Sequence, residues 1–250
     1  RVPASGSANS VDFNALRQSG TNVSQLNQGG SLLRTVFELG SDRMRWGSGG
    51  VELRVDLSDP AATNNRYRAE IREGVINQPI PVGSTQAYCM RFRVEELPDL
   101  YGPVHIFQRF NRDIDGPDIG VELTGANQFS NAVPNDIQVV GWDGRHRIGA
   151  KLATVNTLMV VVHNHATNGS YTVILNGTVL RSGSGLNTVG AAGGGWSQFG
   201  LYPHGLYAGD GPTRQDQIAS GNTEIQFEYR DYTITSYASG PSDLGGFSVG

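Results

Sequence analysis

The sequence is poor in cysteine and contains no long hydrophobic run. Its single cysteine, Cys89, cannot form a disulfide within the chain, and its apolar neighbours indicate a buried small side chain. No apolar stretch is long enough to span a bilayer, so we expect no membrane insertion. The chain starts at Arg1 without a signal-like apolar run, which favours a processed or excised piece of a longer protein.

Lysine is almost absent. Only Lys151 among the 19 basic residues is a lysine, and the net charge is −4. This balance argues against a nucleic-acid or membrane-surface partner, because both require a basic face. Nearly all the positive charge is therefore carried by guanidinium groups, which bind carboxylate or sulfate through paired hydrogen bonds. Genomic codon bias is the alternative explanation for the preference for arginine over lysine.

The composition favours one β domain. The 34 glycines and the low charged fraction of 17% are typical of short strands joined by turns. We expect residues 1–30 to be an extended lead-in with at most one helical turn at residues 13–17, and residues 238–250 to be a Gly/Ser-rich tail. Either end is a linker or a strand along a sheet edge. Residues 31–237 form the domain.

Short runs of β-branched and aromatic residues alternate with polar residues and are separated by turn residues. This pattern predicts an all-β sandwich of antiparallel strands. The clearest hairpin turns at Asn176-Gly177, because this pair adopts the positive φ angles of a tight turn. We expect strands at residues 52–57, 67–73, 88–94, 104–110, 119–124, 137–142, 157–165, 171–175, 178–183, 197–202 and 224–235.

The strand at residues 67–73 carries a charged row. Alternation places Arg68, Glu70 and Arg72 on one face, and Ala69 and Ile71 on the other. A solvated strand face is the simple interpretation. The two guanidinium groups also suit a polyanion groove, because they can clamp carboxylates while Glu70 holds their geometry.

Two further strands carry candidate ligand contacts. In residues 104–110, Gln108 shares a face with Ile106, and the sequence does not decide which face is core. A glutamine amide can stabilise the negative charge that develops on a substrate carboxylate. In residues 197–202, Gln198 and Tyr202 share a face with Gly200, which leaves room for a ligand beside the backbone. An ordinary surface glutamine and a buried tyrosine are the alternatives.

The strings YRAEIR, HIFQRF and QFGLY, in this order, resemble the three strand motifs of jelly-roll polysaccharide lyases. Those motifs are an Arg-x-Glu-Leu-Arg strand, a strand with a glutamine, and a Lys-x-Gly-x-Tyr strand. The resemblance covers residues 50–235 and is nearest to the heparinase-I-like and glucuronan-lyase-like groups, with alginate lyases more distant. It implies a concanavalin-like β-jelly-roll of two antiparallel sheets and a secreted or extracellular lyase. The partner would be an acidic polysaccharide, and no cofactor would be required.

The resemblance also implies a role for each motif residue. Tyr202 would be the catalytic base and acid, and Gln108 would neutralise the uronate carboxylate. Arg72 and Arg68 would bind substrate, and Glu70 would be a structural member of the same substrate-binding set. In a 4-linked glucuronate or mannuronate, the C5 proton and the leaving oxygen lie on one side of the ring, so a single tyrosine can serve both. A phenol has an ordinary pKa of about 10, so nearby arginines would have to favour its anion.

The chain departs from the family pattern at two positions. The glutamine strand often reads Gln-x-His, but the third position here is Phe110, and Gln198 stands where a lysine is frequent. His105, His163 and His204 are the alternatives for the missing histidine, and their spacing does not choose among them. The missing histidine favours syn elimination and disfavours guluronate as substrate. We expect His105, His204 and Gln198 among the substrate-binding residues.

Two other segments are weaker candidates. Trp142 lies beside two arginines and a histidine, which suits a sugar-stacking edge, although a plain Asp-Gly turn explains the segment equally well. Asp113, Asp115 and Asp118 are spaced as calcium ligands can be, but the late glutamate of a calcium loop is missing. A Gly-Pro pair inside this stretch favours a polar turn. A structural calcium ion is therefore only an alternative here.

Three functions compete. The first is a lyase that cleaves a uronic-acid polysaccharide by β-elimination. The second is a non-catalytic, lectin-like carbohydrate-binding module of a larger surface or phage-tail protein. The third is a concanavalin-like glycoside hydrolase, which needs a carboxylate pair in a Glu-x-Asp-x-x-Glu type of string. The sequence contains no such string.

Overall fold

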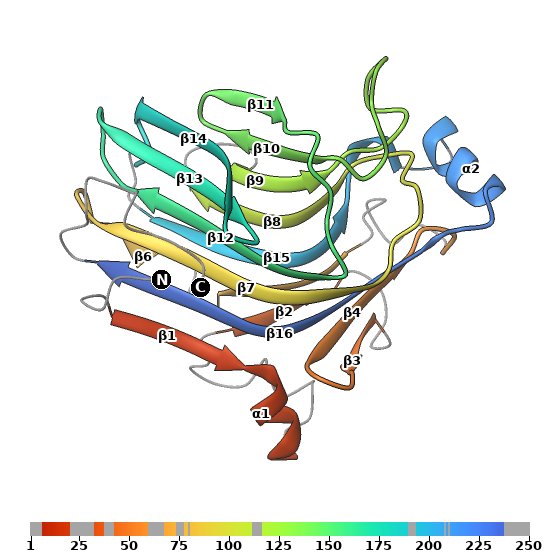
Figure 1. The fold of residues 1–250 in the computed structure, drawn as a ribbon, viewed down its shortest axis with the longest axis horizontal. Helices are drawn as coiled ribbons and strands as arrows, with labels where there is room; N and C mark the ends of the chain where they lie inside the picture. Colours follow the sequence, from red (N-terminus) through yellow and green to blue (C-terminus); the bar gives the residue numbers. More distant parts are fainter. Residues whose placement is uncertain are drawn as a thin grey trace.

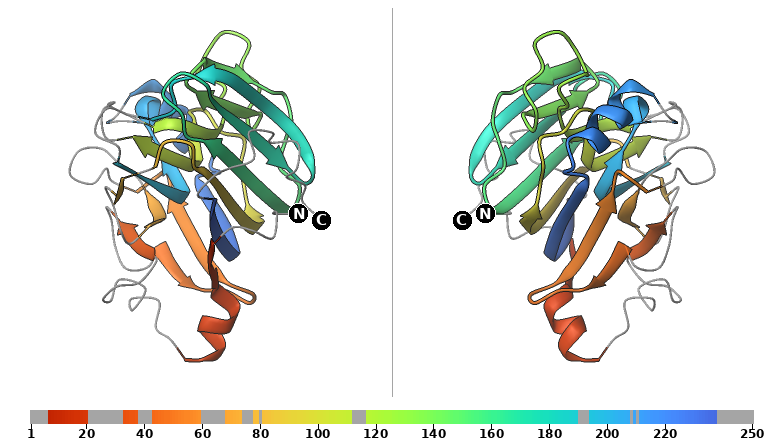
Figure 2. Two further views of the ribbon diagram at one scale, coloured as in Figure 1. Left: turned by 90° about the vertical axis from the view of Figure 1, so that its left-hand side faces the viewer. Right: turned by 90° about the vertical axis from the view of Figure 1, so that its right-hand side faces the viewer.

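Two antiparallel β-sheets pack face to face in the computed structural model of the chain (Figures 1 and 2). The structure describes residues 7–20, 33–37, 43–59, 68–73, 78–79, 81–111, 117–189, 194–207, 209 and 211–237.

The first sheet, sheet 1, is built around the long strand β16 (Glu224–Tyr237), which pairs with β7 (Thr85–Glu96). On its other edge β16 pairs first with β4 (Val51–Asp56) and then with β1 (Ser7–Asp12). The remaining strands of sheet 1 are β3 (Met44–Trp46) beside β4, and β12 (Val155–His163), β13 (Gly169–Leu175) and β14 (Thr178–Leu186) beyond β7.

The second sheet, sheet 2, carries the three strands whose motifs were singled out in the sequence. Its central strand β15 (Gly194–Pro203) lies between β8 (Val104–Asn111) and β5 (Ala69–Glu73). The other strands of sheet 2 are β9 (Pro117–Leu123), β10 (Ile137–Gly141) and β11 (Gly144–Arg147) beyond β8, β2 (Leu33–Phe37) beside β5, and β6 (Gln78–Pro79) beside β15.

Helices are short in the described part of the chain. Helix α1 (Phe13–Gln18) begins after Asp12, whose carboxylate accepts a hydrogen bond from the Ala15 backbone at 3.0 Å. A 3-10 turn (Gly205–Tyr207) and helix α2 (Pro212–Ala219) follow β15, and α2 lies at one end of the sandwich (Figure 1). None of the described helices is long and apolar enough to cross a membrane.

The core fills the space between the sheets. Alternate residues of facing strands are fully buried there, and aromatic side chains make close contacts, such as Phe199 of β15 with Tyr232 of β16 at 4.3 Å between ring centroids. A charged side chain and its partner also lie in this interior. The guanidinium of Arg109 is fully buried and donates to Asp118 Oδ2 at 2.6 Å and to Asn164 Oδ1 at 2.7 Å.

The sandwich predicted from the alternation is confirmed, and each expected strand is present within a few residues of its predicted bounds. The turn at Asn176-Gly177 has the expected positive φ angles of 50° and 81°. In the N-terminal segment, the pairing of β1 with β16 makes residues 7–12 an edge strand of sheet 1. The predicted tail at residues 238–250 lies outside the described residues.

Candidate active site

A cavity of about 500 Å³ opens on the outer face of sheet 2. It brings together the four residues on which the sequence interpretation centred, from strands β5, β8 and β15. The residues that line it are Arg68, Arg72, His105, Gln108, Phe110, Pro117, Val140, Arg145, Trp196, Gln198, Tyr202 and His204.

Strand β5 has the two faces that its sequence predicts. Ala69 and Ile71 are fully buried in the core, while Arg68 and Arg72 face the cavity. Glu70 shares the arginine face but is itself buried, with 1% of its surface exposed. This carboxylate lies beneath the cavity and does not line it.

Glu70 is the hub of the hydrogen bonds under the cavity. Its Oε1 accepts from Gln108 Nε2 at 2.8 Å, and its Oε2 accepts from Gln198 Nε2 at 3.3 Å. Arg68 Nε lies 3.5 Å from the same Oε2. One buried carboxylate therefore contacts side chains of β8, β15 and the residue before β5, and it lies under the cavity, where we had expected Glu70 to contact substrate.

Tyr202 is held mainly by ring contacts. The Arg68 guanidinium lies 4.0 Å above its ring centroid, and the rings of His105 and His204 lie 6.0 and 5.6 Å away. Its hydroxyl has no hydrogen-bond partner among the described residues. The hydroxyl is therefore free to act on a ligand in the cavity.

Gly200 serves packing between strands, and not the approach of a ligand. Its φ is +135°, and an added Cβ would lie 2.4 Å from the carbonyl oxygen of Ala69. The glycine lets β5 approach β15 closely, and it does not line the cavity. The expectation that it makes room for a ligand is wrong.

A β-bulge decides the faces of β8. The register with β9 shifts between His105 and Phe107, and both Ile106 and Phe107 are buried in the core. Because the bulge adds one residue, His105 is on the same face as Gln108 and lines the cavity. The strict alternation that grouped Ile106 with Gln108 is wrong at this point.

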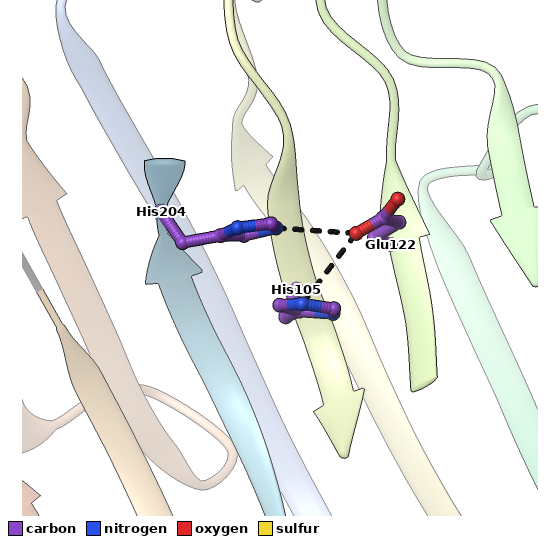
Figure 3. Close-up of side chains that lie close together, drawn as sticks. All are labelled: His105, Glu122 and His204. Carbon is purple, nitrogen blue, oxygen red and sulfur yellow. Dashed lines mark hydrogen bonds and ion pairs between the residues drawn. The ribbon is translucent and has the colours of Figure 1, made fainter. Parts of the chain in front are cut away.

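Glu122 of β9 meets two histidines at one end of the cavity (Figure 3). Its Oε2 lies 3.2 Å from His204 Nε2 and 3.5 Å from His105 Nε2. Burial tends to raise the pKa of Glu122, but the hydrogen bond from His204 and the charge of Arg145 lower it to about 2. Burial lowers the pKa of His105 to about 3. At neutral pH the carboxylate is charged and the His105 ring is neutral.

Two candidates lie away from the cavity. Trp142 packs against Tyr171, with 5.9 Å between ring centroids, and is absent from the cavity lining. His163 belongs to sheet 1, where its Nδ1 lies 3.1 Å from Thr85 Oγ1. His105 and His204 thus remain as the histidines near Tyr202.

Of the three aspartates considered for calcium, Asp118 is the one that the structure describes. Asp118 is buried and pairs with Arg109 inside the sandwich. A register shift between Arg109 and Phe110 accompanies this inward turn of Asp118. Asp113 and Asp115 lie outside the described residues.

Known structures resemble the fold of this chain, although no protein-family model and no curated protein matches the sequence. An alginate lyase of polysaccharide lyase family 7 aligns with a TM-score of 0.55 and 16% identity, over 82% of this chain and 94% of its own. An endo-β-1,4-glucuronan lyase from Trichoderma reesei aligns at 0.52 with 12% identity, over 83% and 88%. An endo-1,3-β-glucanase from Streptomyces sioyaensis aligns at 0.60 with 9% identity, over 95% and 99%. The fold is a jelly-roll sandwich. At these identities the likeness concerns the fold alone.

The jelly roll places further residues at the site that the motif comparison did not single out. Trp196 stacks on Phe110 with 5.0 Å between ring centroids, and Arg145 of β11 binds Glu122. Glu122 had a sequence signal. It is a charged residue in an apolar strand, and alternation puts it with Gly120 on the face opposite the core. Arg145 had no such sequence signal, because its position depends on how β10 and β11 pair.

Proposed function

We propose that this protein is a polysaccharide lyase that cleaves a uronic-acid polysaccharide by β-elimination. The observation that carries the proposal is the convergence of Arg68, Arg72, Gln108 and Tyr202 on one cavity. Guanidinium and amide groups bind carboxylates, and a hydroxyl without a partner lies among them. Because uronic-acid polymers are found outside cells, we place the protein there as well.

The reaction assigns one task to each group. A base removes the C5 proton, the C5–H electrons form the C4=C5 double bond, and the C4–O bond breaks as the leaving oxygen takes a proton. Gln108 and the arginines stabilise the charge that develops on the substrate carboxylate. Tyr202 removes the C5 proton and protonates the leaving oxygen on the same side of the sugar ring. This geometry favours glucuronate or mannuronate.

The likeness to a β-glucanase raises the alternative of a glycoside hydrolase. Glycoside hydrolases mostly use two carboxyl groups that flank the scissile bond. No carboxylate lines the cavity among the described residues. Glu70 and Glu122 are buried beneath it, and both are engaged by neighbouring side chains. This lining supports the lyase over the hydrolase.

A lectin-like module would share the groove and differ at Tyr202. The test is incubation of the protein with glucuronan, polymannuronate, polyguluronate and heparin, followed by the far-ultraviolet absorbance of the unsaturated product. We expect product from a glucuronate or mannuronate polymer. Tyr202→Phe should bind that polymer and release no product. Binding without product by the unaltered protein would instead support the lectin-like module.

A further inference from the structure

The cluster of Glu122, His105 and His204 has no task in the mechanism above (Figure 3). It lies beside Tyr202, and its two histidines line the cavity. The inference drawn from it rests on the proposed lyase function. It concerns how a tyrosine hydroxyl, whose ordinary pKa is about 10, can act as a base near neutral pH.

The Glu122 carboxylate is fixed in orientation. Its Oε1 accepts hydrogen bonds from Gln138 and Arg145, and a longer one from Gln128 at 3.3 Å. Only Oε2 is directed at the histidines, and it lies 3.2 Å from His204 Nε2. An ionised carboxylate only accepts hydrogen bonds, so His204 Nε2 must carry the proton.

The second ring nitrogen of His204 is then the basic one. A neutral imidazole with its proton on Nε2 has a free lone pair on Nδ1. Nδ1 has no hydrogen-bond partner among the described residues, and the ring is partly exposed in the cavity. Its centroid lies 5.6 Å from that of Tyr202. The ring that carries this base is therefore a neighbour of the Tyr202 ring.

The same three side chains could in principle hold a metal ion. The ring geometry argues against this. The rings of His105 and His204 are stacked, with 4.2 Å between centroids and 15° between planes. An imidazole binds a metal in its own plane, and two nearly parallel, stacked planes do not meet at a nearby point. The arrangement suits a carboxylate oxygen that accepts a hydrogen bond from His204 and lies 3.5 Å from His105 Nε2.

We propose that Glu122 and His204 form a proton-accepting pair that activates Tyr202. The phenol proton passes to Nδ1 of His204 through one bridging water, and Glu122 stabilises the resulting imidazolium. The phenolate then takes the C5 proton and delivers it to the leaving oxygen, which regenerates the phenolate. Glu122 is a positioning residue in this scheme. Because the His105 ring is neutral, it does not form an ion pair with Glu122, and the carboxylate charge stabilises the imidazolium of His204.

Activity measurements test the proposal first. His204→Ala should lower kcat roughly 10²- to 10⁴-fold with little change in KM, and added imidazole should restore part of the rate. Imidazole should not rescue Tyr202→Phe, which lacks the hydroxyl. The matched control is His163→Ala on sheet 1, which should retain the wild-type kcat. A His204→Ala variant with wild-type kcat would leave the lyase standing and overturn the pair.

The hydrogen bond itself can be tested without activity. Nitrogen NMR of the imidazole should show His204 protonated at Nε2 and bare at Nδ1. In Glu122→Gln, the donors Gln138 and Arg145 should hold the amide oxygen at the Oε1 position, so the amide NH₂ faces His204 and reverses the bond. The imidazole proton should move to Nδ1, and kcat should fall by about as much as in His204→Ala.

Two results separate the proposals. If the tautomer changes as expected but no polymer is cleaved by the wild type, the proposed function fails and the hydrogen-bonded pair is supported. If one equivalent of zinc binds to the wild type and not to His204→Ala in calorimetry, the cluster is a metal site and the pair is overturned. A Tyr202 variant would bind zinc normally in that case.

Discussion

Gln108 Nε2 donates a hydrogen bond to Glu70 Oε1 at 2.8 Å, although strand β15 lies between the strands that carry the two residues. The bond passes over β15 on the cavity side of sheet 2. The bond fixes the orientation of the Gln108 amide, because the nitrogen must face Glu70. One N–H of this nitrogen is used by Glu70, and the second remains for a ligand. A buried carboxylate thus sets the orientation of the group that we expect to meet the substrate carboxylate.

Loss of either partner should slow the reaction in the same way. We expect Gln108→Ala to lower kcat roughly 10²- to 10³-fold, as the loss of one electrostatic donor does in other enzymes. Glu70→Gln should have a similar effect, because the amide of Gln108 is no longer held. Steady-state kinetics of the double variant should show a loss well below the product of the single losses. Multiplicative losses would contradict the coupling, and Gln86→Ala in sheet 1 serves as the unaffected control.

Tyr202 and Tyr232 offer a matched pair of tyrosines. Tyr202→Phe should lower kcat at least roughly 10²-fold and leave the melting temperature unchanged, because its hydroxyl has no partner among the described residues. Tyr232→Phe should do the reverse. It loses the 2.6 Å contact with Ser197 Oγ in the core, at a cost of about 1 to 3 kcal/mol, and keeps its kcat. The prediction fails if Tyr202→Phe retains activity.

Part of this site could be predicted from sequence because the faces of its strands differ sharply. In β5, small apolar residues alternate with charged ones, so the positions of Arg68 and Arg72 follow from the pleat. In β8 both faces carry apolar and polar residues, and a bulge at Ile106 decides the outcome for His105. A bulge depends on how neighbouring strands pair, and alternation within one strand does not reveal it.

The contacts of Glu122 illustrate the same limit. Its strand and face follow from the alternation, but its partners come from β8, β10, β11 and the end of β15. Their convergence depends on strand order in sheet 2, which a single sequence does not encode in a readable pattern. Trp142 shows another limit, because its local composition suggests sugar stacking, whereas its distance from the cavity follows from the pairing of β9 and β10 and its packing against Tyr171.

Arg72 should contribute mainly to substrate binding. A charge-assisted hydrogen bond contributes about 1.5 to 3 kcal/mol, so Arg72→Ala should raise KM roughly 10- to 100-fold with a smaller effect on kcat. The KM of the wild type should also rise with salt concentration, because salt screens the attraction between guanidinium groups and a polyanion. Arg45→Ala is the control, since Arg45 is exposed on sheet 1 and pairs with Glu52. An unchanged KM in Arg72→Ala would remove this residue from the site.

Asp143 should make stability depend on acid pH. Tyr171 donates to its Oδ1 at 2.5 Å and Arg181 donates to its Oδ2 at 2.6 Å. Burial tends to raise the pKa of Asp143, but these hydrogen bonds lower it from 3.8 to about 2. Because the pKa is lower in the folded state, the stabilisation is present above 3.8 and is lost as the pH falls towards 2.

Asp143→Asn should therefore reduce the free energy of unfolding by about 1 kcal/mol at neutral pH, a value that allows for the partial exposure of the carboxylate. The difference from the wild type should shrink as the solution is acidified. Denaturant unfolding at several pH values measures this directly. A difference that stays constant down to the lowest pH would show that Asp143 acts through shape and not through its charge.

Arg109 and Asp118 form a fully buried ion pair between the sheets, 2.6 Å apart, to which Tyr88 and Asn164 add further hydrogen bonds. Arg109→Met should cost about 3 to 5 kcal/mol, because it leaves a buried carboxylate without its cation.

Burial already raises the pKa of Asp118 to about 6, and loss of Arg109 raises it further. The native state of this variant then favours the protonated acid, so its stability should be greater below pH 4 than at pH 7. The double variant Arg109→Met with Asp118→Leu should be more stable than Arg109→Met alone at neutral pH and should lose this pH dependence, because no buried charge remains. Equal stability of the single and double variants at neutral pH would show that packing, and not the unpaired carboxylate, determines the cost.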